Sequence, residues 1–142
     1  MANTIDPEFQ NIVKNSIVGL LGISSEVLTP DLVVMTMPVD ARTHQPLGLL
    51  HGGASVVLAE TAASTGTYLN LNPQKQLPVG LEINANHLRS KRSGLVKARA
   101  IPLYKGRTTM VWEIKITDEE EKLICISRCT MAIVDADKIS RE

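Results

Sequence analysis

Aromatic side chains are scarce in this sequence: one Trp, one Phe and two Tyr make up 3% of its 142 residues. A platform that stacks the bases of single-stranded nucleic acid needs more of them. A surplus of charge is also missing, because 15 basic and 15 acidic residues cancel. Proteins that bind the phosphate backbone have a basic surplus or a basic stripe instead. These shortages argue against a nucleic-acid partner and leave the core to aliphatic side chains.

Long apolar runs are missing as well, since no stretch approaches the ~20 apolar residues of a membrane span. The first residues include acids and no apolar run, so they do not read as a secretory signal. The only two cysteines, Cys125 and Cys129, would lie about 13 Å apart on one face of a strand, too far for a disulfide. We therefore expect a cytoplasmic protein with reduced, buried thiols and no membrane partner.

Motifs for metals and cofactors are not found either. The three histidines are scattered and both cysteines belong to one run, which gives no tetrahedral ligand set. The sequence contains no GxGxxG, Walker A or GxSxG motif. We expect neither a metal nor a cofactor.

The composition that remains, 44% hydrophobic and 21% charged, is typical of one globular domain, and we assign residues 1–142 to it. Apolar periodicity predicts a helix over Glu8–Leu21, ended by Gly22, and a second helix over Gly52–Tyr68. Apolar and alternating runs predict five strands: Leu32–Val39, Val79–His87, Leu95–Ile101, Thr108–Ile116 and Leu123–Val134.

The helix over residues 52–68 carries small or apolar residues all the way round, which predicts burial on every side. Short turns between the last four strands predict that these strands are sequential antiparallel neighbours. A sheet curled around the helix would cover it. The predicted class is therefore α+β: an antiparallel sheet of about five to six strands around a central buried helix.

Glu60 lies in the most apolar part of that helix. An ionised carboxylate there costs several kcal/mol unless it is paired or its pKa rises. This cost favours a catalytic or ligand-binding role. The alternatives are a structural carboxylate hydrogen-bonded to Ser64, or a glutamate at a wet subunit interface.

Two glycines, Gly52 and Gly53, begin the same helix directly after His51. They allow close approach of a ligand and leave helix N–H groups for an oxygen that becomes negative during a reaction. The alternative is a glycine-rich helix start without a ligand. Along the helix, His51 and Glu60 are about 13 Å apart. A site that uses both therefore requires a second chain with an antiparallel helix, in a twofold dimer with two equal sites.

The other histidines, His44 and His87, belong to no recognisable motif. We interpret them as surface histidines or as histidines with satisfied hydrogen bonds. Basic side chains follow His87 and recur in what is expected to be a neighbouring hairpin turn. There they would either hold a phosphate-bearing group or be solvated. These side chains are Arg89, Lys91, Arg92, Lys105 and Arg107.

Three runs carry a resemblance to a known family: residues 45–60 (QPLGLLHGGASVVLAE), 79–89 (VGLEINANHLR) and 111–114 (VWEI). Together they resemble the hotdog-fold acyl-CoA thioesterases, in the branch of the PaaI-like and Arthrobacter-type 4-hydroxybenzoyl-CoA thioesterases. That branch includes thioesterases for 1,4-dihydroxy-2-naphthoyl-CoA and for proofreading in enterobactin synthesis. The resemblance covers nearly the whole chain after about Ser16.

The resemblance implies a central helix wrapped in an antiparallel sheet, homodimers joined edge to edge, and homotetramers made of two dimers. It implies a thioesterase that hydrolyses an acyl-CoA or acyl-carrier-protein thioester, with Glu60 as nucleophile or general base. Gln45 and His51 would flank the thioester, and the Gly53 N–H would polarise its carbonyl. Ser64 would position water or hold the carboxylate. The acyl group itself would be aromatic or of medium length.

The resemblance also implies residues that bind the substrate and its CoA moiety. They form the helix start, one position on a strand, the segment after that strand and a hairpin turn: Gly52, Gly80, His87, Leu88, Arg89, Ser90, Tyr104, Gly106, Arg107 and Thr108. At Tyr104 the chain departs from the many members that have His.

Two other functions are alternatives on the same scaffold. One is an acyl-thioester hydratase or dehydratase, in which a His near a carboxylate takes a proton from the α-carbon. The other is a non-catalytic acyl-CoA-binding protein, which in a regulator would add a DNA-binding segment that this chain has no room for. The thioesterase hypothesis depends on Gln45, His51, Gly53 and Glu60.

Overall fold

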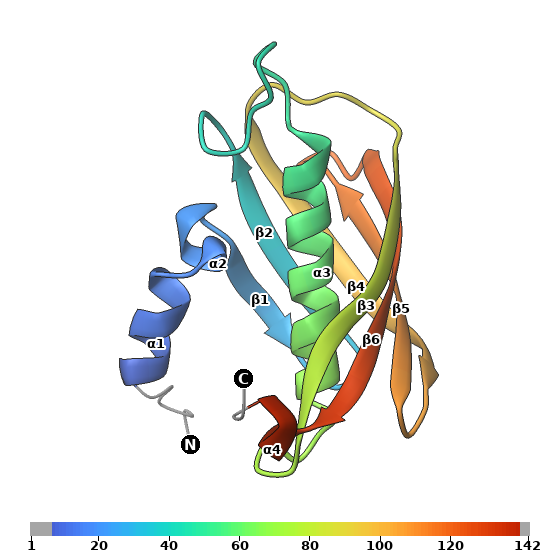
Figure 1. Cartoon of the computed structure of the whole chain (residues 1–142). Helices are drawn as coiled ribbons and strands as arrows, with labels where there is room; N and C mark the ends of the chain where they lie inside the picture. Colours follow the sequence, from blue (N-terminus) through green and yellow to red (C-terminus); the bar gives the residue numbers. More distant parts are fainter. Residues whose placement is uncertain (1–6, 140–142) are drawn as a thin grey trace.

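The computed structural model describes residues 7–139. Its main element is one antiparallel sheet in the order β1-β2-β4-β5-β6-β3, with the long helix α3 (Gly52–Tyr68) across one face (Figure 1). The strands are β1 (Ser24–Leu28), β2 (Val33–Val39), β3 (Gln76–His87), β4 (Gly94–Lys105), β5 (Thr109–Thr117) and β6 (Leu123–Asp135). Three short helices, α1 (Pro7–Lys14), α2 (Ile17–Leu20) and α4 (Ala136–Ile139), lie near the chain ends. The predicted α+β class is confirmed.

Alternation in the sequence decides which face of the sheet is buried under α3. Val96, Ala98 and Ala100 of β4 are fully buried, while Lys97 and Arg99 between them are exposed. On β5 the fully buried Trp112 lies against Gly66 of α3, where an added Cβ would come within 2.4 Å of its ring. The Trp112 indole N–H donates to Thr67 Oγ1 at 2.9 Å, so its one polar group is satisfied inside the core.

Helix α3 is buried on one side only in the single chain, which corrects the prediction that it is buried all round. Its sheet-facing residues are buried: Ala54, Ser55, Leu58, Ala59, Ala62, Ala63, Gly66 and Thr67. A stripe on the other side is half-buried, and it consists of Val57, Glu60, Thr61, Ser64 and Thr65. The spacing of three and four residues makes this stripe one continuous face of the helix. This outer stripe carries Glu60.

β4, β5 and β6 are sequential antiparallel neighbours as predicted, but β3 does not take its predicted place beside β4. β3 pairs with β6, and β4 lies between β2 and β5. The segment 88–93 therefore crosses the end of the sheet from one edge to the middle (Figure 1). Three strand spacings measure about 14 Å, and six extended residues reach about 20 Å, so the short connection can make this crossing.

β3 is an edge strand, and among residues 7–139 no strand pairs with its outer side. Its predicted alternation holds only in part. Ile83 and Ala85 pack against the core, but Val79 and Leu81 are 42% and 64% exposed. The pairing with β6 shifts register between Gly80 and Glu82, and such a bulge turns the side chains beyond it.

The N-terminal segment is two helices where one was predicted. Ser16 separates them: its hydroxyl donates to the Val13 carbonyl at 2.6 Å and accepts from the Val18 N–H at 3.2 Å, which caps α2. Gly22 then ends the segment with a φ of +70°, as a helix-stopping glycine should. β1 was not predicted. No helix within the described part of the chain is long and apolar enough to span a membrane.

Candidate functional site

The start of α3 is built around His51 and two glycines. His51 is the N-cap residue, with extended backbone (φ −70°, ψ 130°), and its Nδ1 accepts a hydrogen bond from the Gly53 N–H at 2.7 Å. Gly52 faces the ring of His87, which ends β3: a Cβ at Gly52 would lie 2.6 Å from His87 Nε2. Only glycine therefore lets the imidazole of His87 lie against the first turn of the helix.

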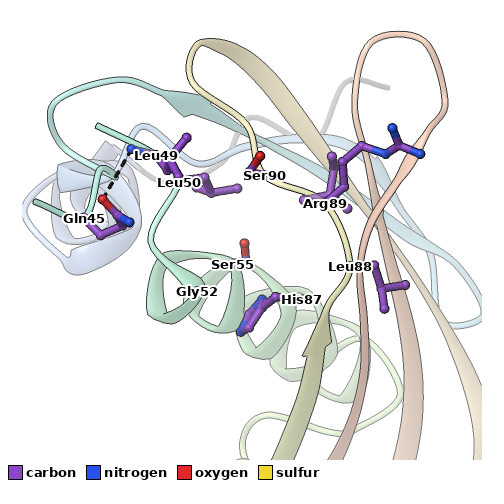
Figure 2. A pocket seen from close by; sticks show the side chains of 10 residues that line it. Gln45, Leu49, Leu50, Gly52, Ser55, His87, Leu88, Arg89 and Ser90 are labelled. Atoms are coloured by element: carbon purple, nitrogen blue, oxygen red, sulfur yellow. Dashed lines mark hydrogen bonds between the residues drawn. The ribbon is translucent and has the colours of Figure 1, made fainter. Parts of the chain in front are cut away.

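A cavity of about 360 Å³ opens at this helix start (Figure 2), and we call it the helix-start cavity. Its walls come from the loop before α3, from the first turn of α3, and from the end of β3 with the following segment. The lining residues are Gln45, Leu49, Leu50, Gly52, Ser55, His87, Leu88, Arg89, Ser90 and Ile124. Six of the predicted site residues thus meet in one cavity, from sequence positions more than forty residues apart.

Backbone contacts hold the two loops of this cavity together. The Leu50 N–H donates to the Lys91 carbonyl at 2.7 Å, and His44 Nε2 lies 2.8 Å from the Arg92 carbonyl. His44 is thus a structural link between the loops. The side-chain carbonyl of Gln45 accepts from the backbone N–H groups of Leu47 and Leu49, so its amide hydrogens are the part that can donate to a ligand.

Glu60 lines a different cavity, of about 470 Å³, which we call the Glu60 cavity. Its walls are the outer stripe of α3, the helix α2 and the strands β3 and β6. The lining residues are Ile17, Val18, Val57, Glu60, Thr61, Ser64, Thr65, Gly80 and Met131. Glu60 and Ser64 therefore bring polar groups to a largely apolar hollow.

The absence of a side chain at Gly80 leaves the space that the Glu60 carboxylate occupies in this cavity. A Cβ at Gly80 would lie 2.0 Å from Glu60 Oε1, which is far inside van der Waals contact. The carboxylate therefore lies directly over the backbone of β3, just before the bulge. Gly80, predicted as a CoA-binding position, touches the candidate catalytic group in the same chain.

The candidate catalytic residues fall into two groups in one chain. The helix-start cavity and the Glu60 cavity have no lining residue in common among residues 7–139. Glu60 follows His51 by nine positions along the helix, which is about 13 Å along the axis. The prediction was that a second chain completes each site. The separation of the two groups within one chain is a condition of that prediction, which itself stays a prediction.

The predicted basic cluster is wrong for a single chain. Arg89, Lys91 and Arg92 lie at the helix-start end, whereas Lys105 and Arg107 lie at the β4–β5 turn, at the other end of twelve-residue β4 (Figure 1). Tyr104, Gly106 and Thr108 belong to the same distant turn.

Both lysines of the predicted cluster, Lys91 and Lys105, are already in ion pairs within the chain. Lys91 Nζ is 2.7 Å from Glu119 Oε2, and Lys105 Nζ is 2.6 Å from Asp31 Oδ1. The hydrogen bond from Lys91 is the main reason that the pKa of Glu119 falls to about 2, aided by the backbone N–H of Leu95. Glu119 thereby ties the segment after β3 to the turn between β5 and β6.

The two thiols do not offer a second nucleophile. Cys125 and Cys129 are both free and buried, as predicted. Burial raises the pKa of Cys125, and it raises the pKa of Cys129 to about 12, with a smaller effect of the carboxylates of Glu60 and Glu82. Protonated thiols are poor nucleophiles. Within residues 7–139, no group of three or more His, Cys, Asp or Glu side chains could hold a metal ion.

Sequence reasoning missed the residues that complete the Glu60 cavity, namely Ile17, Val18, Val57, Thr61, Thr65 and Met131. The signal that was available is the spacing of Val57, Thr61 and Thr65, one helical turn apart on the face that carries Glu60. Nothing local connects Ile17 and Val18 with that face, because their contact with α3 is formed only on folding.

Comparisons with known proteins agree with this geometry. The family model described as the thioesterase superfamily matches residues 47–125. A 1,4-dihydroxy-2-naphthoyl-CoA hydrolase of Listeria monocytogenes is 53% identical over 113 residues, which cover 80% of this chain and 91% of the relative. Another protein of that name, from Escherichia coli K12, is 50% identical over 121 residues, covering 85% of this chain and 88% of the relative. The crystal structure of a mutant thioesterase PA1618 from Pseudomonas aeruginosa superposes with a TM-score of 0.86 at 50% identity, covering 94% of this chain and 97% of the other.

Proposed function

The chain belongs to the thioesterase superfamily and is a thioester hydrolase with the hotdog fold, and from this we propose that it hydrolyses an acyl-CoA thioester to the free acid and CoA with Glu60 as its catalytic carboxylate. The observation that carries the proposal is the position of Glu60. Its carboxylate lies against Gly80 at the polar end of an apolar cavity, where a thioester carbonyl would meet it.

The chemistry needs a carboxylate on one side of the carbonyl and a hydrogen-bond donor for its oxygen on the other. Glu60 would attack the carbonyl carbon, expelling the CoA thiolate and leaving a mixed anhydride that water hydrolyses. Alternatively, Glu60 would take a proton from water, whose oxygen attacks the carbon while the C–S bond breaks. In both routes the protonated thiol and the free acid are the products. Ser64, in the same cavity, is suited to position the water.

The donor for the carbonyl oxygen would be the Gly53 N–H at the positive end of the α3 dipole. In the free protein this N–H is bonded to His51 Nδ1, so the substrate oxygen would replace the imidazole as acceptor. The imidazole and the Gln45 amide would then flank the thioester. A single oxyanion donor of this kind is worth about 3–4 kcal/mol of barrier.

Glu60 and Gly53 would come from different protomers, because they line separate regions of one chain. We infer a twofold dimer in which the open edge of β3 pairs with the same edge of a second copy. A twelve-residue edge strand whose outer side has no partner among residues 7–139, with exposed Val79 and Leu81, is suited to such pairing. The second chain would also bring its β4–β5 turn, with Tyr104 and Arg107, as a candidate for CoA contacts. Pairing of dimers into a tetramer is the arrangement that the resemblance implies.

Replacement of Glu60 tests the proposal directly. Glu60→Ala should lower kcat/KM for acyl-CoA hydrolysis by about 10²–10⁴-fold, because it removes the base or nucleophile. Thiol release, followed with a thiol reagent, measures the rate. Glu26→Ala, which removes an exposed glutamate of β1 at the opposite edge of the sheet that pairs with Lys97, is the matched control and should retain activity. Hydrolysis at the wild-type rate by folded Glu60→Ala would refute the assignment.

The same variant tests the shared site by complementation. Gly53→Pro removes the N–H donor, and proline is tolerated in the first turn of a helix. Each variant alone should be nearly inactive. Co-expression of the two should restore about a quarter of the wild-type activity, because each mixed dimer combines an intact Glu60 with an intact Gly53 at one of its two sites. Purification through two different tags isolates the mixed dimer, and a lack of restored activity there would contradict the shared site.

A further inference from the structure

A third cavity adjoins the Glu60 cavity on the side of the N-terminal helices. It measures about 400 Å³ and shares three lining residues with the Glu60 cavity: Val18, Thr61 and Thr65. Its other walls include Phe9 and Val13 of α1. We call it the N-terminal cavity. The two hollows thus lie side by side along Val18, Thr61 and Thr65, and joined past Val18 they would make one path from the Glu60 carboxylate to the Phe9 and Val13 side of α1.

The polarity of this path changes along its length. At its start stand Glu60 and Ser64. In its middle, the hydroxyl of Thr61 donates to the Val57 carbonyl at 2.6 Å, and that of Thr65 donates to the Thr61 carbonyl at 2.8 Å. Since both hydroxyls are directed at the helix backbone, their methyl groups remain for the cavity. Farther on, most of the lining is apolar. An apolar group that begins at a polar carbonyl fits this gradient.

The wall on the N-terminal side is held less firmly than the rest of the fold. No residue of α1 or α2 is buried, although Phe9, Val13 and Val18 of these helices line the path. Phe9 and Ile17, which line it, remain 52% and 53% exposed. A wall of this kind can repack around groups of different length.

We propose that the acyl group of the thioester extends from Glu60 along this path and that α1, through Val13 and Phe9, sets the acyl length that the enzyme accepts. The inference depends on the proposed function, since it takes Glu60 as the position of the carbonyl. It assigns to the N-terminal helices a role in substrate selection that the chemistry itself does not require.

A substitution that narrows the N-terminal cavity tests this inference. Val13→Phe should leave kcat/KM for butyryl-CoA within about twofold of wild type and lower it for dodecanoyl-CoA by about 10-fold or more, the usual scale of discrimination in apolar pockets. The matched control is Ile12→Phe, which places the same phenyl side chain on the same helix at a 60% exposed position that does not line the cavity. This control should leave kcat/KM unchanged at every acyl length.

The opposite change provides a second readout. Phe9→Ala should raise the rate for the longest acyl groups relative to butyryl-CoA, and unfolding temperatures should show that each variant is folded. Identical profiles for Val13→Phe and Ile12→Phe, or a uniform loss at every acyl length, would overturn the inference. Such a result would leave the proposed function intact as long as Glu60→Ala abolishes hydrolysis. A wild-type protein that hydrolyses no acyl-CoA would refute the proposed function instead.

Discussion

The helix-start cavity and the Glu60 cavity are built by different forces. The first is framed by directional contacts: the Leu50–Lys91 backbone bond, the His44 link to Arg92 and the ring of His87 against Gly52. The second is framed mainly by apolar side chains, and one of its walls comes from α2, none of whose residues is buried. Hydrogen bonds fix distances and angles, whereas apolar packing fixes little more than volume.

This difference corresponds to two demands on a thioester hydrolase. The oxygen that becomes negative must meet its donor within a few tenths of an ångström, so the helix start has to be rigid. The acyl group only has to be covered. Within the Glu60 cavity, the approach of the Glu60 carboxylate to Gly80 is the place where geometry is constrained, because it leaves no room for a Cβ. Close placement thus occurs beside the proposed chemistry in both cavities.

Gly80→Ala is the sharpest way to disturb this placement while keeping the carboxylate, and after the loss of Glu60 itself we expect the largest effect from it. The new methyl group would lie 2.0 Å from Glu60 Oε1, so the carboxylate must swing away. Since the group that moves is the end of a flexible side chain, stability should change little. Displacement of a reacting group by about 1 Å can cost about 10²-fold in rate. We therefore expect kcat/KM to fall by about 10²-fold.

Two measurements separate this effect from a general defect. Unfolding temperatures of wild type and Gly80→Ala should agree within a few degrees, and Gln76→Ala, at the start of the same strand, should retain full activity. A variant that loses stability and activity together would show that Gly80 serves the bulge of β3 and not the position of Glu60.

The sequence was sufficient for elements with a strong local pattern. The bounds of α3 were predicted to the residue, because small and apolar residues fill it between Gly52 and the polar turn after Tyr68. β1 was missed, since two serines and a glutamate in five residues show no alternation. The pairing of β3 with β6 was also missed, because the short segment 88–93 gives no sign that it crosses the end of the sheet. Local patterns define elements, but their order in a sheet depends on distant contacts.

The candidate site was predictable to a similar degree. Glu60 was distinguished by its apolar neighbours, and the resemblance supplied Gln45, Gly52 and the segment from His87 to Ser90, which do share a cavity. The contact of Gly80 with Glu60 had no signal in the spacing, because it joins a helix to an edge strand across a turn. The walls of the N-terminal cavity likewise arise only on folding, when residues of α1 and α3 that are far apart in the sequence come to line one hollow.

Acid should loosen the helix-start cavity first, through Glu119, and this is the smallest effect that we predict. Its carboxylate accepts hydrogen bonds from Lys91 and from the Leu95 N–H, and Lys91 belongs to the loop that Leu50 binds. The pKa of Glu119 lies at about 2, below its ordinary value of 4.5. A lowered pKa means that the ionised group stabilises the folded state above the ordinary value, and that this contribution is lost as the pH falls toward 2.

Glu119→Gln should therefore flatten the decline of the unfolding temperature between about pH 4.5 and pH 2. Lys91→Met should flatten it less, because the Leu95 N–H remains as a donor to the carboxylate. Hydrogen exchange adds the spatial test: on acidification of the wild type, the Leu95 amide should lose protection before the amides of β5 that pack under α3. If the unfolding temperatures of wild type, Glu119→Gln and Lys91→Met fell in parallel with pH, the role of Glu119 would be contradicted. Simultaneous loss of protection everywhere would mean that the helix-start region opens only when the whole fold does.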